Sequence, residues 1–521
     1  MNKEIHLIIP MSGVGKRFLD VGYKEPKPLI EVDGKPIIEH VINLFPGIKK
    51  VTFVCNKTHL EVTNMREVLL NISPNCTVLE VPDDLKMGPV YAISKIFTHI
   101  DDDDEIIFSY CDYGTVWDFD TFLKTKDNYD GLIPSYIGFH PHMLGSDNYA
   151  FSKIENDLVV EIREKQPFTD NKMKEYASNG TYYFKSGKMV KKYFKELIEN
   201  DINVNGEYYI SLVYNLLIRD GLKVGVFEIE KMLQWGTPYD LEVYKGWSKY
   251  FNNLKTWSLT ATCPNNTTLI LPMAGKGSRF SELGYDIPKP ILPVNNNPMI
   301  VEAVGCLPKT DNKTFITLSE HVTKYHIDNV LKDKYIGCDV VEIGSVTEGQ
   351  ACTCEIGLNE SYVDLEKPIL ISASDNGILY DNIKIQKLLD DKSIDVIVWS
   401  FRNSQSSKVS PNSYAWLDVD NDDNIKHVSC KKFIYDDPLK THAIVGTMFF
   451  RKAKYFMDGL HKNYEENVRT NNEFYVDDVL NQNIKLGLNV KVFEVDNYIC
   501  WGTPDDYRTY NYWKEYFQNY Y

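Results

Sequence analysis

Two stretches of the chain, LIIPMSGVGKRF at residues 7–18 and LILPMAGKGSRF at residues 269–280, decide the fold. Each begins with an apolar run typical of a buried strand and continues into a loop that contains two glycines. Each is followed by Gly-Tyr and then by Pro-Lys-Pro, whose lysines, Lys27 and Lys289, are 262 residues apart. A strand, a loop and a lysine that recur in this order predict two copies of one domain.

Further blocks recur in the same order through both halves. They are FSYCDYG and ISASDNG, EKQPF and CKKFI, NGTYYF and VGTMFF, GEYYI and NEFYV, and a WGTPxD near each end. The spacing between partners drifts only from 262 to 266 residues, which small loop insertions would produce. Because 521 residues exceed the usual size of one domain, we predict a first domain over 1–253, a linker over 254–266 and a second domain over 267–521.

Within each copy, short apolar runs alternate with segments of helical periodicity. Ile5 to Ile9 and Val51 to Cys55 have the length and composition of buried strands, whereas Pro36 to Leu44 and Val90 to Phe97 have helical spacing. This alternation predicts an α/β fold in which each domain is a mostly parallel mixed sheet flanked by helices. Ligands of such sheets bind beyond the carboxyl ends of the strands, where the repeated blocks are expected to lie.

Composition narrows the classes of partner and compartment. The formal net charge of −16 disfavours duplex nucleic acid and anionic membranes as partners. The 10 cysteines include no C-x-x-C pair, which disfavours a zinc ribbon or redox motif and favours reduced thiols. No apolar run approaches the ~18–20 residues of a membrane span. We therefore expect a cytoplasmic protein that binds neither nucleic acid nor membrane.

The glycine loops have features of phosphate-binding loops. Glycines let the backbone approach a ligand and expose N–H groups to phosphate oxygens, and Arg17 and Arg279 add guanidinium donors. A P-loop is excluded because Arg17 follows Gly-Lys, and a dinucleotide fingerprint is excluded because phenylalanine replaces its last glycine. For the loop alone, a tight strand-to-helix turn is the alternative. Flanking prolines predict that Lys27 and Lys289 lie in extended segments that preorganise their ammonium groups.

Taken together, PMxGxGxRF, GYxxPKPL/I, an apolar run ending in aspartate and a late WGTPxD resemble the sugar-nucleotide pyrophosphorylase type of nucleotidyltransferase. The GEYYI and QWGTP blocks are similar to cytidylyltransferases of surface-polysaccharide and phosphonate pathways. The resemblance implies two Rossmann-like, GT-A-like domains that condense a nucleoside triphosphate with a sugar phosphate or another small phosphorylated acceptor and release pyrophosphate. The similarity favours CTP as the triphosphate.

The resemblance also implies roles for individual residues. Catalytic roles fall to Arg17, Lys27, Arg279 and Lys289. The nucleotide is expected to contact Met11, Ser12, Gly13, Gly15, Gly88, Met273, Ala274, Gly275, Gly277, Gly349 and Gln350. The acceptor is expected to contact Lys165, Gly180, Glu207, Lys431, Gly446 and Glu473. For the acceptor set, ordinary surface lysines, β-bulge glycines and helix-start carboxylates are the alternatives.

A Mg²⁺ site is expected at Asp112 and Asp375, because hard oxygen ligands suit a cation that bridges phosphates. An aspartate that only caps a loop is the alternative. Many relatives carry a second aspartate ligand where this chain has Gln234 and Cys500, so a full two-aspartate site is in doubt. We interpret the later Asp240 and Asp506 as helix caps.

Three hypotheses for the whole chain follow. In the first, both halves are active sites. In the second, one catalytic half is joined to a regulatory or structural half that binds a nucleotide or sugar. In the third, the chain is a non-catalytic assembly subunit, which retention of both lysines and both aspartates disfavours. The C-terminal aromatic run predicts a helix packed on its own domain, with contact to the other half or to a second chain as the alternative, so a homo-oligomer and an intrachain pseudo-dimer both stay open.

Overall fold

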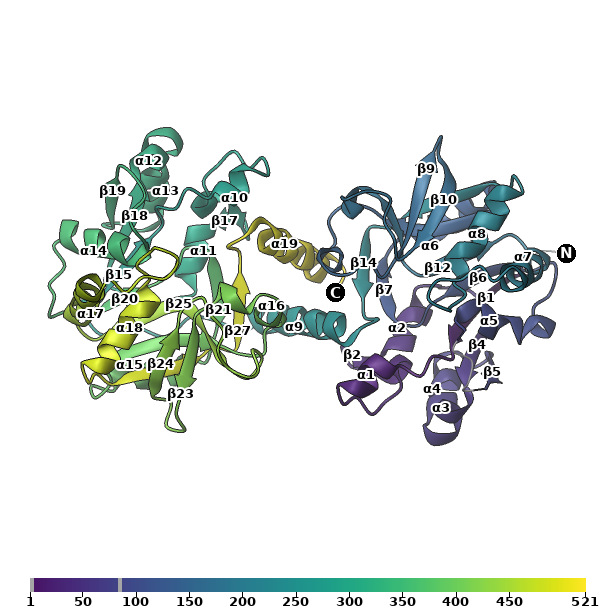
Figure 1. Cartoon of the computed structure of the whole chain (residues 1–521), viewed down its shortest axis with the longest axis horizontal. Helices are drawn as coiled ribbons and strands as arrows, with labels where there is room; N and C mark the ends of the chain where they lie inside the picture. Colours follow the sequence, from purple (N-terminus) through teal and green to yellow (C-terminus); the bar gives the residue numbers. More distant parts are fainter. Residues whose placement is uncertain (1–3, 83–86) are drawn as a thin grey trace. The chain divides into compact units, whose positions relative to one another are not determined.

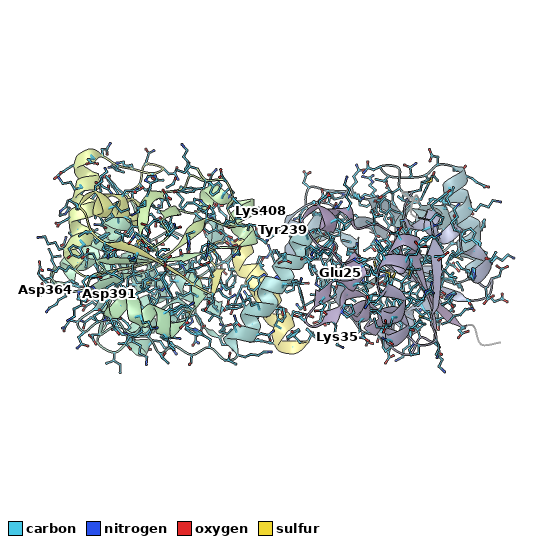
Figure 2. The ribbon with its side chains drawn as sticks, turned by 90° about the horizontal axis from the view of Figure 1, so that it is seen from below. Glu25, Lys35, Tyr239, Asp364, Asp391 and Lys408 are labelled. Atoms are coloured by element: carbon cyan, nitrogen blue, oxygen red, sulfur yellow. The ribbon has the colours of Figure 1, made fainter. Side chains whose placement is uncertain are left out.

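The computed structural model describes residues 4–82 and 87–521, and the chain divides into two compact units (Figure 1). The first unit comprises Met1–Lys249 together with Tyr512–Tyr521, and the second comprises Tyr250–Asn511. Each unit is a mixed sheet flanked by helices, which confirms the predicted fold class. Charged side chains such as Lys35, Asp364 and Lys408 project from the surface (Figure 2). No helix in the described part of the chain has the length and apolar character needed to cross a membrane.

The large sheet of the first unit has the strand order β10-β9-β11-β8-β12-β6-β1-β4-β5, with β13 beside β8. Its strands are β1 (Ile5–Met11), β4 (Lys50–Asn56), β5 (Thr77–Val81), β6 (Glu105–Ser109), β8 (Gly131–Tyr136), β9 (Ala150–Glu155), β10 (Leu158–Glu164), β11 (Tyr176–Ser178), β12 (Thr181–Phe184) and β13 (Val224–Glu228). β1 pairs in parallel with β4 and β6, whereas β12 is antiparallel to β6 and β8. β1 lies between the parallel strands β4 and β6, and this central position explains why β1 is apolar along most of its length.

Helices flank this sheet and pack on it through clusters of buried apolar residues. They are α1 (Lys16–Asp20), α2 (Ile37–Asn43), α3 (Lys57–Val62), α4 (Met65–Ile72), α5 (Pro89–Ser94), α6 (Phe119–Thr125), α7 (Gly187–Glu199), α8 (Ile210–Arg219) and α9 (Pro238–Leu254). One such cluster includes Ile8, Phe108 and Val213, and another includes Tyr136 and Met232. The buried strands therefore hold the loops at their carboxyl ends in place.

The second unit has the sheet order β19-β18-β15-β20-β25-β22-β26, with β23 and β24 beside β25. Its strands are β15 (Thr268–Pro272), β18 (Asn312–Leu318), β19 (Asp339–Ile343), β20 (Ile369–Ile371), β22 (Val396–Phe401), β23 (Trp416–Val419), β24 (Ile425–Ser429), β25 (His442–Phe450) and β26 (Val490–Glu494). Its helices are α10 (Ser278–Ser281), α11 (Met299–Gly305), α12 (Ser319–Tyr325), α13 (Ile327–Lys334), α14 (Gln350–Glu360), α15 (Asn382–Asp390), α16 (Gln405–Val409), α17 (Ala453–Glu466), α18 (Val476–Lys485) and α19 (Pro504–Asn519). As in the first unit, the strand before the glycine loop, β15, has parallel neighbours on both sides.

Four two-stranded ribbons accompany the large sheets in the described part of the chain. They are β2 (Glu31–Val32) with β3 (Lys35–Pro36), β16 (Pro293–Val294) with β17 (Asn297–Pro298), β7 (Tyr113–Val116) with β14 (Lys231–Gln234), and β21 (Asn376–Leu379) with β27 (Asn497–Cys500). The last two ribbons join the aspartate block of each unit to its WGTP block. At their ends the Trp235 N–H donates to the Asp112 carbonyl over 3.1 Å, and the Trp501 N–H donates to that of Asp375 over 2.8 Å.

Both WGTP blocks end in a helix cap. The Thr237 hydroxyl donates to the Asp240 carboxylate over 2.6 Å, and the Asp240 N–H donates back to the threonine oxygen over 3.1 Å. Thr503 and Asp506 repeat these two distances at the start of α19. The threonine oxygen therefore caps each helix, and the aspartate predicted to be the cap instead holds the threonine hydroxyl in place.

The C-terminal segment departs from the expectation that the last helix packs only on its own domain. Residues 512–521 belong to the first unit, where the buried Tyr512 hydroxyl donates to the Met232 carbonyl over 2.8 Å. Glu515 forms an ion pair of 2.8 Å with Lys231, and the Phe517 ring packs against Tyr244. The first unit is therefore built from both ends of the chain.

Candidate active site

The glycine loops lie against the Pro-Lys-Pro lysines in both units. Gly15 and Gly277 have φ of 67° and 63°, a left-handed backbone that favours glycine. A Cβ atom at either glycine would lie 3.7 Å from the Cβ atom of Lys27 or Lys289, respectively. The fold thus brings together two motifs that lie about ten residues apart in the sequence.

The other loop residues have simple positions. Met11, Met273 and Ala274 are buried at the ends of the central strands, whereas Gly13 and Gly275 are exposed with open space around them. The Ser12 carbonyl accepts a hydrogen bond from the Asn56 side chain over 3.3 Å. The exposed backbone of the two glycines is thus accessible to a ligand.

Each Pro-Lys-Pro lysine forms an ion pair with the aspartate after the next central strand. Lys27 Nζ lies 2.7 Å from Asp112 Oδ2, and Lys289 Nζ lies 2.6 Å from Asp375 Oδ2. The four side chains are between 22% and 26% exposed, so the pairs are screened from water without being sealed from it. The predicted extended segment is wrong for the lysines themselves. Each begins a short 3-10 turn after an extended proline, since its flanking N–H and carbonyl groups close a tight turn.

Each ion pair shifts the pKa of one of its members toward the charged form. Burial lowers the pKa of Lys27, but the charge of Asp112 and its hydrogen bond outweigh burial, so this pKa lies above its ordinary value. Burial raises the pKa of Asp375, yet Lys289 and Arg279 outweigh burial and hold that pKa below its ordinary value. Each site therefore presents a fixed ammonium and a fixed carboxylate side by side.

Arg17 and Arg279 are exposed cations beside these pairs. Arg17 acts electrostatically on Lys27, Asp240 and Tyr209, and Arg279 acts on Asp375. Neither guanidinium forms an ion pair within residues 4–82 and 87–521. Both are therefore available to an anionic ligand.

The glycine of each WGTP block lies against the carboxylate of the aspartate in its unit. A Cβ atom at Gly236 would lie 2.9 Å from Asp112 Oδ2 and 3.1 Å from Gln234 Oε1. In the second unit, a Cβ atom at Gly502 would lie 2.9 Å from Asp375 Oδ2 and 3.3 Å from the Cys500 sulfur. Glycine is the one residue type that leaves these carboxylates in place.

The side chains beside each aspartate, Gln234 and Cys500, affect how well each site could hold the expected Mg²⁺. Asp112 and the Gln234 amide oxygen are hard oxygen donors that suit Mg²⁺ when phosphates supply further ligands. In the second unit a thiol whose pKa is raised by burial takes the place of the amide, which leaves Asp375 as the hard donor. Within the described residues, no group of three or more His, Cys, Asp or Glu side chains could hold a metal. The first site therefore fits a phosphate-bridging cation better than the second.

The loops that contain the predicted nucleotide residues Gly88 and Gly349, called the base-side loops below, pack on the GEYYI and NEFYV blocks through backbone contacts. The Tyr208 N–H donates to the Met87 carbonyl over 2.8 Å, and the Phe474 N–H donates to the Glu348 carbonyl over 2.8 Å. Cβ atoms at Gly88 and Gly349 would approach the backbone of Tyr208 to 2.7 Å and that of Phe474 to 2.5 Å. Lys86, which belongs to the first of these loops, lies outside the described residues. Sequence spacing alone did not predict these contacts, which span more than 100 residues.

Gly349→Ala is expected to destabilise the second unit by about 1–3 kcal/mol, because φ at this position is 136° and a Cβ atom would collide with backbone. Urea unfolding of the second unit measures the loss. Gly344→Ala is the matched control, since a Cβ atom there has open space and is expected to change stability by less than about 0.5 kcal/mol. Equal unfolding midpoints for the two variants would show that the close packing is not needed.

The predicted acceptor lysines both follow the end of a strand and adopt a left-handed backbone. Lys165 has φ of 58°, its ammonium bonds the Tyr209 hydroxyl, and it lies 3.9 Å from the Glu207 carboxylate. Lys431 has φ of 53° and donates to the Ser413 carbonyl over 2.5 Å. A positive φ is unusual for lysine, so the backbone at both positions is held in a strained conformation by its surroundings.

The remaining predicted acceptor and nucleotide residues are two glycines, two glutamates and Gln350. Gly180 and Gly446 have positive φ values of 96° and 100°, and Gly446 lies where the pairing of β25 with β22 shifts register, as in a β-bulge. Glu207 accepts a hydrogen bond from Tyr209, and the exposed Glu473 interacts in the same way with Tyr475. Gln350 is the first residue of α14. Of these residues, Glu207 contacts the predicted acceptor residue Lys165, at 3.9 Å.

Two carboxylates beside the acceptor lysines were missed in the sequence. Glu164 precedes Lys165 and accepts a hydrogen bond from Ser211 over 2.5 Å. Asp477, two residues beyond Tyr475, faces Cys430 at 3.9 Å. Comparison of the two halves at every position of the aligned blocks, and not only at their shared letters, could have found both.

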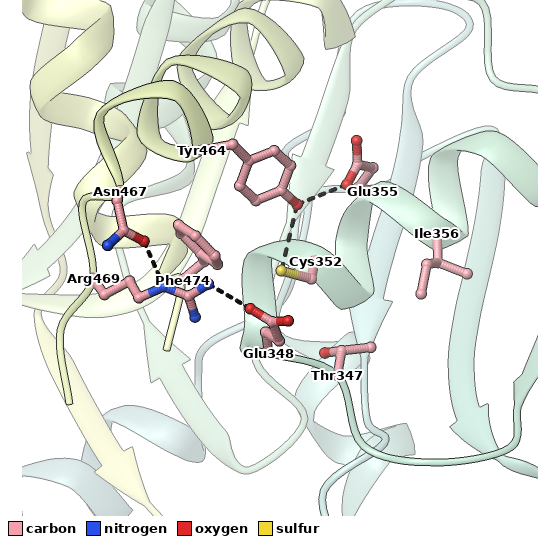
Figure 3. Close-up of a pocket in the computed structure, with 9 residues that line it drawn as sticks. All are labelled: Thr347, Glu348, Cys352, Glu355, Ile356, Tyr464, Asn467, Arg469 and Phe474. Carbon is pink, nitrogen blue, oxygen red and sulfur yellow. Dashed lines mark hydrogen bonds and ion pairs between the residues drawn. The ribbon is translucent and has the colours of Figure 1, made fainter. Parts of the chain in front are cut away.

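A pocket of about 430 Å³ opens in the second unit behind its base-side loop (Figure 3). Arg469 lies 2.5 Å from Glu348 and over the Phe474 ring, and the Tyr464 hydroxyl donates to Glu355 over 2.7 Å. The residues that line it include none of the predicted site residues. The pocket is therefore separate from the Lys289–Asp375 pair.

Comparison with known proteins matches residues 7–213 to the family described as "Nucleotidyl transferase", which confirms the predicted resemblance over that range. "Bifunctional protein GlmU" of Staphylococcus epidermidis is 27% identical over 234 residues, which cover 43% of this chain and 47% of that protein. The protein of the same name from Buchnera aphidicola subsp. Schizaphis graminum is 29% identical over 216 residues, covering 40% and 42%. The chain thus spans about half the length of the curated relatives it matches.

Among solved structures, the nucleoside-diphosphate-sugar pyrophosphorylase from Vibrio cholerae RC9 aligns with a TM-score of 0.39 at 21% identity, covering 46% of this chain and 99% of that one. The inositol-1-phosphate CTP transferase from T. maritima aligns with a TM-score of 0.36 at 17% identity, covering 47% and 95%.

Proposed function

We propose that this chain, whose residues 7–213 form a nucleotidyl transferase domain, condenses a nucleoside triphosphate with a small phosphorylated acceptor, and that it does so at two sites. The observation that carries the proposal is the lysine–aspartate pair beneath a glycine loop, which recurs at 2.7 and 2.6 Å in the two units. The recurrence supports a tandem duplication with domains at 1–253 and 267–521. The proposed product is NDP-linked.

The reaction is an in-line displacement at phosphorus. A phosphate oxygen of the acceptor forms a bond to the α-phosphorus, the bond from that phosphorus to the bridging oxygen breaks, and pyrophosphate leaves with the electron pair. Two polyanions must meet, so the main contributions of the protein are alignment and cationic stabilisation. Lys27 and Arg17, and Lys289 and Arg279 in the second unit, supply that positive charge.

The remaining residues position the substrates. The backbone N–H groups of Gly13 and Gly275 are accessible to phosphate oxygens. Lys165 and Lys431 would bind the acceptor phosphate. Asp112 with Gln234, and Asp375 alone, would hold Mg²⁺. When bound, this cation would offset negative charge on the phosphates.

A second candidate has one catalytic half and one half that only binds a nucleotide or sugar. The observation that favours it is Cys500, which replaces an oxygen donor beside Asp375 by a buried thiol. In that case the first unit would be the catalytic one.

Pyrophosphate release tests the activity. The intact protein with Mg²⁺ is assayed with CTP, UTP, ATP, GTP and dTTP against glucose 1-phosphate, N-acetylglucosamine 1-phosphate, inositol 1-phosphate and glycerol 3-phosphate. We expect release that requires one triphosphate and at least one acceptor, with CTP tested first because of the motif similarity. Release that needs no acceptor, or no release with any pair, would contradict the proposal.

A further inference from the structure

The pocket of the second unit is bounded by two helices and two loops (Figure 3). Glu355 and Ile356 follow Cys352 by three and four residues, so all three line the pocket from one face of α14. Tyr464 comes from the end of α17, and the base-side loop and the segment between α17 and α18 supply the other lining residues. A volume of about 430 Å³ is within the range of pockets that bind small molecules.

Arg469 is held firmly in the wall of this pocket. Its guanidinium lies 4.0 Å from the centre of the Phe474 ring. Nε donates to the Asn467 side chain over 2.9 Å, Nη1 to the Asn472 carbonyl over 3.1 Å and Nη2 to the Glu348 carboxylate over 2.5 Å. The other two of its five N–H groups have no hydrogen-bond partner within the described part of the chain. The cation is therefore preorganised to bind a carboxylate.

The Glu348 carboxylate marks the position that an anionic ligand would take. Its side chain is 69% exposed, and so exposed an ion pair contributes little stability, so a free carboxylate replaces it at small cost. A second carboxylate in the wall, that of Glu355, accepts the Tyr464 hydroxyl over 2.7 Å and would repel a second negative charge on the ligand. The Tyr464 and Phe474 rings meet edge to face at 4.8 Å and add an aromatic surface. This lining favours a planar molecule with one carboxylate.

The first unit has uncharged residues at the corresponding positions. Met87 corresponds to Glu348 when the base-side loops are aligned. Asn203 corresponds to Arg469 when GEYYI is aligned with NEFYV, and its amide bonds Asp201 over 2.8 Å. The backbone bond between the two segments is nevertheless 2.8 Å long in both units, so the fold does not need the charged pair. The presence of this pair in the second unit points to a ligand there.

The pocket shares a wall with the base-side loop. Glu348 directly precedes Gly349, and the Glu348 carbonyl accepts the Phe474 N–H over 2.8 Å. The Thr347 hydroxyl donates to the Gly349 carbonyl over 2.7 Å. Release of the Glu348 side chain from Arg469 therefore removes one of the contacts that hold this loop.

We propose that this pocket binds a small planar monocarboxylate, which replaces Glu348 on Arg469 and thereby lowers the affinity of the second site for its triphosphate. The effect on the triphosphate rests on the proposed function, whereas the binding of the carboxylate does not. Because coupling between two sites is reciprocal, the triphosphate must lower the affinity for the carboxylate by the same factor.

The first test measures binding to the intact protein. The probe is β-naphthoate, which has a planar ring system and a single carboxylate, and it is titrated by saturation-transfer NMR. We expect saturable binding with a Kd of about 1 mM or tighter. The matched probe β-naphthylmethanol has the same rings without the charge and is expected to bind at least about tenfold more weakly. Equal binding of the two probes, or no saturable binding of β-naphthoate, would overturn the proposal.

Two variants should change the affinity for β-naphthoate in opposite directions. Arg469→Gln is expected to weaken binding at least about tenfold, because the cation is lost. Glu348→Gln is expected to strengthen binding about two- to fivefold, because the competing carboxylate is lost. Arg402→Gln is the matched control with unchanged binding, since Arg402 pairs with Glu494 at 2.5 Å in the same unit and does not line the pocket. Equal affinities of all three variants would contradict the assignment of the site.

A third variant fills the pocket without changing its charge. Cys352→Tyr introduces the side chain that the first unit carries at the corresponding position, Tyr91, and is expected to weaken binding at least about tenfold by occupying the space of the ligand. Thermal unfolding shows whether this variant folds, and the charge variants decide the question if it does not. Unchanged binding to a folded Cys352→Tyr protein would show that the probe binds elsewhere.

The second test measures the coupling. In a Lys27→Ala background, which isolates the second site, saturating β-naphthoate is expected to raise the KM for the triphosphate about two- to fivefold, since the effect cannot exceed the contribution of the exposed ion pair. The acceptor KM should stay within twofold. Glu348→Gln should raise the triphosphate KM to the same extent, and the probe should then add nothing. A triphosphate KM that does not respond to the probe would overturn the proposed regulation.

Failure of this inference and failure of the proposed function are distinguishable. If the unmodified protein releases no pyrophosphate with any pair, the proposed function falls, while probe binding and its response to the variants still decide the carboxylate site. If the unmodified protein is active and β-naphthoate does not bind, the inference alone falls.

Discussion

Lys27→Ala is expected to lower kcat/KM of the first site about 100- to 1000-fold, and Lys289→Ala is expected to do the same at the second. The reason is twofold: the ammonium that would stabilise charge on the transferring phosphate is lost, and Asp112 or Asp375 loses its partner at 2.7 or 2.6 Å. Pyrophosphate release with each active acceptor measures the effect, and the double variant should be inactive.

The outcome separates the hypotheses for the whole chain. Two sites require that each single variant removes one activity and keeps the other. If one variant keeps every activity at the wild-type rate, the two-site proposal is contradicted. If one variant removes all activity, the chain has one catalytic half. Lys27→Arg is a useful companion, because a planar guanidinium keeps the charge without the geometry of an ammonium and is expected to restore little activity.

Gly236→Ala is expected to lower kcat/KM of the first site about tenfold to a hundredfold with little change in folding. A Cβ atom at this position would lie 2.9 Å from Asp112 Oδ2, so the carboxylate must move from the position in which it bonds Lys27. Displacement of a charged group by about 1 Å can have an effect of this size. Gly502→Ala should act in the same way on Asp375.

Steady-state assays in the Lys289→Ala background measure the effect of Gly236→Ala. The matched control is Gly246→Ala in α9, where a Cβ atom has open space and alanine favours the helix by about 1 kcal/mol. This control should keep full activity. If Gly236→Ala also keeps its activity within twofold, the position of the carboxylate does not matter for the reaction.

Much of the architecture could be predicted from the chain itself, because strand and helix periodicity are local properties. The apolar runs before both glycine loops are central parallel strands, and Asp112 and Asp375 come close to the expected lysines. The backbone at Lys27 and Lys289 was predicted incorrectly, since flanking prolines restrict the chain but do not exclude a 3-10 turn that begins at the lysine.

Other site features could not be predicted, because they depend on how distant segments dock. Glu164 and its partner Ser211 are 47 residues apart. They meet because the Asn215 side chain of α8 bonds the backbone N–H and carbonyl of Ile162 in β10 and so holds the helix on the strand. The same holds for the loop at Gly349, whose close neighbour is the backbone of Phe474. No spacing rule relates residues of two loops that the fold brings together.

The chain's own repeat therefore determined the fold class, the two glycine loops and the identity of the charged residues in each site, since these are properties of the side chains and of local periodicity. Tertiary structure alone decided which charges form pairs, which glycines lie against them, and that residues 512–521 complete the first unit. The physical reason is that an amphipathic helix has a buried face in its pattern but no indication of which sheet it covers. That choice depends on the summed packing of the whole unit.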